Sequence, residues 1–360
     1  MKRAVYIDDY GLLSAAGQSP GAVSTALWAG ESAASRHRLG EREFPYFSLP
    51  PSPGLWLARA ARAIQQVAGQ LGPLAENIPL FVASSSFQIG YFEEQGAPFL
   101  LPAASAQFSR QIAEWLGISG PIYSFSNACT SGFSAIDAAR SLIASGLIDE
   151  AIVIGVELPN RATLAGFAAM ELLSPSTCRP FDRRRDGLVL GEAVAAVRLT
   201  SQPRNWRIAA LRTGLDAYST TGPDPSGKPL AELIADCLRE AARSAADIEL
   251  VKLQAAGSPG SDLAEANALR RIFANSMPPL FSLKPVLGHT LGASGIAELA
   301  ALLACLEAEQ IPATQGFAES DPEIALKPTV SRSNAYLQCA LLNLIGFGGG
   351  LASLIVERQR

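Results

Sequence analysis

The sequence predicts an α/β fold, and three observations support this prediction. First, 48% of the 360 residues are hydrophobic and 17% are charged, which is enough apolar material for a large buried core. Second, short runs of β-branched and aliphatic residues recur with the length of buried strands. Third, alanine-rich stretches of helical length lie between many of these runs. Strands that alternate with helices are typical of sheets with helices on their faces.

The expected elements follow from local patterns. Apolar residues recur three and four positions apart in the helical stretches, as Leu230, Leu233, Ile234 and Leu238 do. We expect strands at 4–7, 80–83, 151–156, 194–199, 208–213, 250–254, 340–345 and 353–356. We expect helices at 54–69, 131–145, 230–244 and 263–274.

The chain also shows a weak internal repeat. Residues 5–13 and 208–215 both run from a strand pattern through glycine to leucine, and hairpin-like strand pairs near 151–199 and 338–356 follow them. We therefore predict an N-terminal half at 1–200 and a C-terminal half at 201–360, which meet near 200–205.

Charge and cysteine content narrow the function classes. A net charge of −4 and a pI of about 5.4 argue against nucleic acid as a partner, because phosphate binding needs a basic face. The basic run 183–185 is more typical of a solvated loop or ion-pair network. The five cysteines form no CxxC pair or zinc spacing. We find no signal-peptide pattern, and the apolar stretch 295–308 contains two glutamates and is too short for a membrane span. We expect a soluble, cytoplasmic, reduced protein.

Cys129 has a setting that the other cysteines lack. Residues 121–125 are extended in character, and an amphipathic helix is expected from Ser131, so Cys129 falls on a strand-to-helix turn. The free N–H groups and positive dipole end of a helix favour a thiolate. We interpret Cys129 as functional, and Cys178, Cys237, Cys305 and Cys339 as buried small hydrophobic residues.

Four ordered motifs carry a resemblance to a known family. The first, Asn127-Ala128-Cys129-Thr130-Ser131-Gly132, resembles the nucleophile motif of the β-ketoacyl synthases, and the strand at 149–157 is similar to the one that follows it there. The others are Cys178-Arg179-Pro180-Phe181-Asp182 with Arg185-Asp186-Gly187 and Gly191-Glu192; Ser282-Leu283-Lys284 with 288–293; and Gly346-Phe347-Gly348-Gly349. Because they occur in family order, the chain is identified as a member of the KAS I/II type.

The resemblance implies a thiolase fold, in which two similar α/β halves form a five-layered helix-sheet-helix-sheet-helix core. It implies that Cys129 accepts an acyl group from the phosphopantetheine arm of an acyl carrier protein, so that the chain needs no cofactor of its own. His289 takes the position of the family's second histidine, while Lys284 and Glu298 take those of the supporting lysine and glutamate. The resemblance also implies that the N–H groups of Cys129 and Phe347 form an oxyanion hole, and that Phe347 and Gly348 belong to a gating loop.

The family's first histidine is missing. It belongs in an Ala-His-Gly-Thr motif after strand 250–254, where this chain has Ala256, and the spacing of Asp262 and Glu265 supports this alignment. The loop is about two residues short, and only Ser258 remains of the threonines that usually meet the carrier arm. Alanine donates no side-chain hydrogen bond, and loss of one such donor typically costs about 10²–10³ in rate.

Two residues are candidates to replace that histidine, and the sequence favours neither. Only one other histidine exists, His37, and its polar surroundings indicate an exposed loop. Gln254 shares a strand face with Ala256 but lies two places earlier, so it points along the same face from a different place.

Three functions fit this pattern. The favoured one is a chain-length factor that forms a heterodimer with an active ketosynthase and shapes the acyl tunnel of a polyketide or fatty-acid-like system, of which aryl-polyene synthesis is the best match. The second is an active condensing enzyme or acyltransferase that uses Cys129 and His289. The third is a scaffold without acyl chemistry. A homodimer is the alternative assembly, and Phe133, Phe167 and Met170 are candidates for the tunnel lining, with ordinary helix packing as the alternative.

Overall fold

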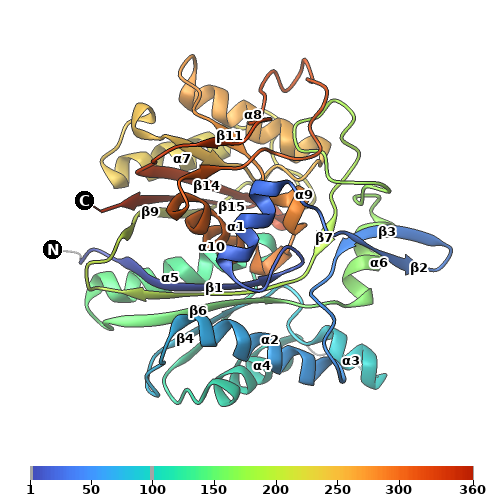
Figure 1. The fold of residues 1–360 in the computed structure, drawn as a ribbon, viewed down its shortest axis with the longest axis vertical. Coiled ribbons are helices and arrows are strands. Elements are labelled where there is room, and N and C mark those ends of the chain that lie inside the picture. The colour runs from blue at the N-terminus through green and yellow to red at the C-terminus, as the bar shows by residue number, and fades with distance from the viewer. Residues whose placement is uncertain (1–2, 98–100, 360) are drawn as a thin grey trace.

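The computed structural model describes residues 3–97 and 101–359, and Figure 1 shows their arrangement. The helices are α1 (Pro20–Ala29), α2 (Trp56–Ala68), α3 (Ile89–Gln95), α4 (Leu101–Leu116), α5 (Ser131–Ser145), α6 (Arg161–Ala169), α7 (Lys228–Ala241), α8 (Pro259–Phe273), α9 (Lys284–Leu287) and α10 (Ser294–Glu307). The main-sheet strands are β1 (Tyr6–Ser14), β4 (Leu80–Ala83), β5 (Ile122–Phe125), β6 (Glu150–Glu157), β8 (Ala193–Thr200), β9 (Trp206–Leu215), β10 (Leu250–Lys252), β11 (Leu280–Phe281), β14 (Cys339–Ile345) and β15 (Gly350–Arg358).

Two smaller sheets complete the described strands. They contain β2 (Ser35–Leu39), β3 (Arg42–Phe47) and β7 (Leu190–Gly191) in one, and β12 (Gln310–Ile311) and β13 (Ser333–Asn334) in the other.

The main sheet consists of two five-stranded sets with the same order. The first set runs β5-β4-β6-β8-β1 and the second runs β11-β10-β14-β15-β9. In each set the second strand pairs in parallel with both neighbours, and the remaining pairs are antiparallel. The sets join where Tyr6 and Ile7 of β1 meet Arg207 and Trp206 of β9. The chain passes from one set to the other between Thr200 and Trp206, while residues 1 and 360, the predicted outer ends of the halves, lie outside the described residues.

Helices cover both sets on both faces. Figure 1 shows α7 and α8 over the second set, α2 and α4 beneath the first, and α5 and α10 between the two. The largest core cluster holds residues of α5 and α10 together with both sets, while separate clusters lie under α7 and α8 and under α2 and α4. The α/β prediction is confirmed, with five layers in the order helix, sheet, helix, sheet, helix.

Most expected elements agree with the structure to within a few residues. The helix expected at 131–145 and the strand expected at 80–83 have the bounds of α5 and β4. The strand expected at 4–7 instead runs as far as Ser14, because β1 continues to pair with β8 over Asp9 to Ser14.

The expectation of a loop around His37 was wrong. This residue lies on β2, half-buried, with its ring stacked on Tyr46 at 4.2 Å and its Nε2 2.9 Å from Ser48 Oγ. Pairing of β2 with β3 supplies the backbone hydrogen bonds that make this polar stretch a strand.

The interpretation of the basic run is confirmed. Arg183 pairs with Glu319, Arg184 with Asp182, and Arg185 with Asp321. Among the described residues, no helix is long and apolar enough to cross a membrane.

Candidate active site

Cys129 lies on a strained turn between β5 and α5. A 3₁₀ turn, Ala128–Thr130, precedes the helix, and Ala128 has a φ of 48°, which a residue with a side chain rarely adopts. Ser131 Oγ accepts from the N–H of Asn127 at 2.8 Å and donates to the carbonyl of Ala128 at 2.6 Å. These bonds fix the turn, and the Cys129 side chain, 4% exposed, points into a pocket.

His289 meets this thiol. The histidine follows α9 and is held by backbone bonds, in which its N–H donates to Val189 O at 2.7 Å and its carbonyl accepts from Gly191 N–H at 3.0 Å. Its Nε2 is 2.9 Å from Cys129 Sγ, and its Nδ1 is 3.3 Å from Ser294 Oγ. When Nδ1 carries the proton and donates to Ser294, the lone pair of Nε2 is free to accept the thiol proton.

Both members of this pair are held in their neutral forms. Burial raises the pKa of the Cys129 thiol to about 11, although the charge of Lys284 and the N–H groups of Phe347 and Cys129 act in the opposite direction. Burial, together with the charges of Lys284 and Lys252, holds the pKa of His289 well below its usual range. Desolvation of the buried thiol therefore outweighs the effect of the helix start, which favours a thiolate. The contact with His289 offers the thiol proton a direct acceptor.

A buried charged triad lies beneath the pair. Lys284 and Lys252, 1% and 0% exposed, each contact a different oxygen of Glu298, and Lys252 Nζ also donates to Asn343 O at 3.1 Å. Lys284 and Glu298 thus lie together, as the resemblance implies, but neither lines the pocket. Sequence reasoning missed Lys252, although a lysine inside the apolar run of β10 was a visible signal.

A second carboxylate fixes the loop after His289. Glu157, 2% exposed at the end of β6, accepts from the N–H of Ser85 at 3.0 Å and from the N–H of Gly292 at 2.9 Å. Because Gly292 belongs to the turn Leu291–Ala293, which follows His289, this carboxylate connects the His289 loop to the end of strand β6.

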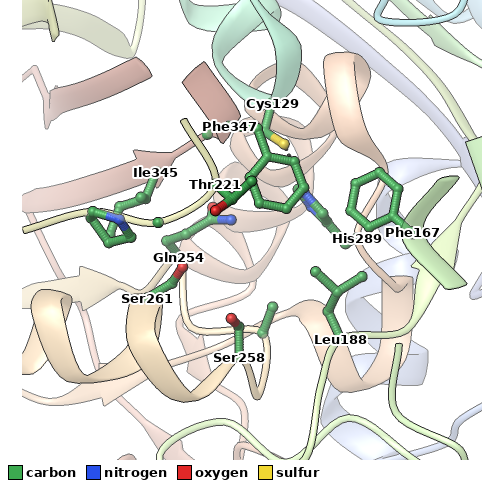
Figure 2. Close-up of a pocket in the computed structure, with 14 residues that line it drawn as sticks. Cys129, Phe167, Leu188, Thr221, Gln254, Ser258, Ser261, His289, Ile345 and Phe347 are labelled. Carbon is green, nitrogen blue, oxygen red and sulfur yellow. Dashed lines mark hydrogen bonds between the residues drawn. The ribbon is translucent and has the colours of Figure 1, made fainter. Parts of the chain in front are cut away.

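The pocket unites most of the predicted site. Its lining includes Cys129, His289, Phe347, Ala256 and Ser258 (Figure 2). Ala256, 5% exposed, shares an apolar cluster with Cys129. A methyl group therefore lies in the wall where the family pattern has an imidazole.

The glycine-rich loop approaches the nucleophile closely. A Cβ added at Gly346 would lie 3.3 Å from Cys129 N, and Gly348 has a φ of 75°. Small residues thus let the loop Phe347–Gly349 bring the N–H of Phe347 to the thiol, where it acts on the thiol as a hydrogen-bond donor. The N–H groups of Phe347 and Cys129 both lie beside the reacting sulfur.

The remaining candidates are dispersed. Phe167 lines the pocket, and its ring packs on Phe347 with centroids 5.2 Å apart. Phe133 is fully buried in the core between α5 and α10, and Met170 is 45% exposed at the end of α6. His37 is not among the pocket-lining residues, whereas Gln254, disfavoured from the sequence, is one of them.

Comparison with known proteins agrees with this geometry. The β-ketoacyl synthase N-terminal domain model matches residues 78–204, and the C-terminal domain model matches 207–318. The nodulation protein E of Rhizobium sp. (strain N33) is 30% identical over 276 residues, which cover 73% of this chain and 67% of that protein. The chain belongs to the β-ketoacyl synthase family.

Other relatives extend this assignment. The chain is 34% identical to the 3-oxoacyl-[acyl-carrier-protein] synthase 2 of Mycobacterium leprae over 62% of its own length, and the match spans 57% of that relative. A chain of the complex between the ketosynthase ApeO and its chain length factor ApeC from Xenorhabdus doucetiae superposes with a TM-score of 0.88 at 26% identity, covering 99% of this chain and 98% of that one. The predicted thiolase fold is confirmed.

Proposed function

We propose that the chain is a chain-length-factor-like subunit, which pairs with an active β-ketoacyl synthase and shapes its acyl tunnel in polyketide or fatty-acid-like biosynthesis of the aryl-polyene type. The observation that carries this proposal is Ala256. It occupies the wall beside Cys129 and His289, so the pocket offers one imidazole to the thioester oxygen of an extender unit. Decarboxylation develops enolate charge on that oxygen, and a missing preorganised donor costs about 3–4 kcal/mol.

The edge of the main sheet supports pairing. Strand β5 ends the sheet, pairs with β4 alone among the described strands and leads directly into the Cys129 turn, and its Tyr123 is 40% exposed. An unpaired edge strand offers backbone donors and acceptors to a second chain. A ketosynthase docked there would lie against the segment that carries the nucleophile, and a solved relative forms a complex of ketosynthase and chain length factor.

Acyl transfer is the second candidate, and the Cys129–His289 contact of 2.9 Å favours it. In this reaction the thiol proton passes to His289 Nε2 as Sγ attacks the thioester carbonyl. The C–S bond to the arm then breaks, and the departing thiolate takes the proton from His289 and leaves as the free thiol. Neither step needs a second imidazole, since the N–H groups of Cys129 and Phe347 face the developing oxyanion. The acyl group arrives on a carrier arm, so this chemistry requires no resident cofactor.

Reconstitution tests the proposal. The tagged chain is purified with its ketosynthase partner from the native source, and the two are then assembled with carrier protein, starter and malonyl extender. We expect product only from the pair, and Cys129→Ala should leave both the complex and the product length nearly unchanged. Phe167→Ala should change the product length, because Phe167 lines the pocket, whereas Met170→Ala on the exposed end of the same helix serves as the matched control.

The outcomes separate the two functions. Complete loss of product with Cys129→Ala contradicts the chain-length-factor role. Intact mass of the chain after incubation with an acyl carrier thioester tests the second candidate, for which an acyl adduct on Cys129 without carbon dioxide release is expected. The isolated chain is also given malonyl carrier alone. If it releases carbon dioxide at an ordinary synthase rate, the proposal that it depends on a ketosynthase partner is contradicted.

A further inference from the structure

Gln254 carries a buried amide oxygen that has no hydrogen-bond partner among the described residues. Its side chain is 4% exposed, and its Oε1 is buried with no hydrogen bond to any described residue. The same side chain lines the pocket of Cys129 and His289, and in Figure 2 it reaches into the pocket from the side opposite Phe167. A buried amide oxygen left unpaired costs about 1–3 kcal/mol, so such a group in a native pocket calls for a ligand that donates to it.

The backbone directs this side chain into the pocket. Side chains alternate along the segment that follows β10, so that Lys252, Gln254 and Ala256 lie on the site side. Leu253 and Ala255 lie on the other side, in the core cluster beneath α7 and α8.

Two carboxylates clamp the segment in place. Glu265 accepts from the N–H groups of Gln254 and Ala255, both at 2.8 Å, and Asp262 accepts from Ala256 N–H at 3.1 Å and Gly257 N–H at 3.2 Å. Both acids are fully buried, so the loop is rigid and its amide is preorganised.

The pocket is polar on the side of Gln254. Thr221, Ser258 and Ser261 line it there, whereas Phe167, Leu188 and Phe347 form an apolar wall. A glutamine side chain accepts through Oε1 and donates through Nε2, which is the complement of the N–H and C=O of a secondary amide. A pantetheine thioester carries such an amide two methylene groups from its sulfur. When that sulfur lies beside Cys129, an amide two methylene groups away falls within reach of the pocket that Gln254 also lines.

We propose that Gln254 is the recognition residue for the first amide of a pantetheine thioester. It binds the arm in place of the threonines that this shortened loop lacks. The inference rests on acyl entry to Cys129, the second candidate function, and it assigns Gln254 to binding and specificity rather than to the reacting atoms.

Paired thioesters test this assignment. In the Cys129→Ala chain, which cannot be acylated at that position, calorimetry measures the Kd of butanoyl-N-acetylcysteamine and of butanoyl S-pentyl thioester, which has the same length but no amide. We expect the amide thioester to bind about 5- to 100-fold more tightly, the range of one hydrogen bond to a buried group. Gln254→Leu should abolish this preference, and Gln254→Glu, which keeps an acceptor for the amide N–H, should retain more of it. Gln338→Leu, outside this pocket, is the matched control.

Each outcome bears on the assignment. Equal affinity for the two thioesters, or an unchanged preference in a folded Gln254→Leu chain, overturns it. Intact mass of the wild-type chain is recorded in parallel. An amide preference without an adduct on Cys129 supports the amide subsite and rejects acyl transfer. An adduct without an amide preference supports acyl transfer and rejects the subsite. Butanoyl-coenzyme A and butanoyl carrier protein identify which arm is bound, and for either one the tighter binding must disappear with Gln254→Leu.

Discussion

Ala256→His restores the donor that the pocket lacks, and it tests the central energetic argument. Ala256 lies in the wall that also contains Cys129 and His289, so an imidazole on this Cα would face the same thioester oxygen as His289. One preorganised donor to a developing oxyanion is worth about 3–4 kcal/mol, or about 10²–10³ in rate. We expect decarboxylation of malonyl carrier by the isolated chain to rise by about that factor.

The assay measures carbon dioxide release from malonyl carrier protein by the chain alone. Ala256→Leu is the matched control, because leucine fills similar space but donates no hydrogen bond. Thermal unfolding shows which variants stay folded. If Ala256→His is folded and releases carbon dioxide no faster than Ala256→Leu, the missing imidazole does not limit the reaction and the reasoning fails.

Two stability measurements examine the buried charges. Glu298→Gln leaves Lys252 and Lys284 without a counter-charge, and it should lower the free energy of unfolding in urea by about 3–5 kcal/mol. Lys252→Met leaves one balanced ion pair and should lower it by less. Equal losses for the two variants would contradict the triad. Burial raises the pKa of Glu192 from 4.5 to about 7. Between these values the native state binds a proton that the unfolded chain does not, so this group's contribution to stability falls as pH rises through the window. Glu192→Gln should therefore raise the melting temperature relative to wild type at pH 8 but hardly at pH 4.5. The corresponding gain in the free energy of unfolding is at most about 3 kcal/mol. An equal gain at both pH values would contradict the raised pKa of Glu192.

The features that depend on neighbouring residues in the chain could be predicted from the sequence. The turn at Cys129 and helix α5 were predictable because an extended run, a small-residue turn and an amphipathic helix follow one another directly. His289 came from the family resemblance, since nothing local indicates that it meets a residue 160 positions away. Lys252 was missed because its role depends on Glu298, which reaches it only through packing of α10 between the two strand sets.

Burial explains the errors that remain. The helix start favours a thiolate at Cys129, but enclosure of the thiol, which only the assembled fold reveals, has the larger effect. The alternation that places Gln254 on the face of Ala256 was recognised, but the clamp by Glu265 that aims its side chain into the pocket is a tertiary contact. Sequence patterns thus located the reacting groups and left their charge states undetermined.

The buried charges near the site favour an acyl group bound to Cys129 over decarboxylation of an extender unit. Two lysines on one carboxylate give the triad a formal surplus of one positive charge, which opposes protonation of His289 and attracts an oxyanion near Cys129. This long-range attraction stabilises the oxyanion of acyl transfer, whose charge develops beside the N–H groups of Cys129 and Phe347. It does not replace a directed hydrogen bond to an enolate, because a hydrogen bond depends on distance and angle as well as on charge. A chain with this pocket is therefore expected to hold an acyl group on Cys129 more readily than it extends one, and a ketosynthase partner would supply the extension step.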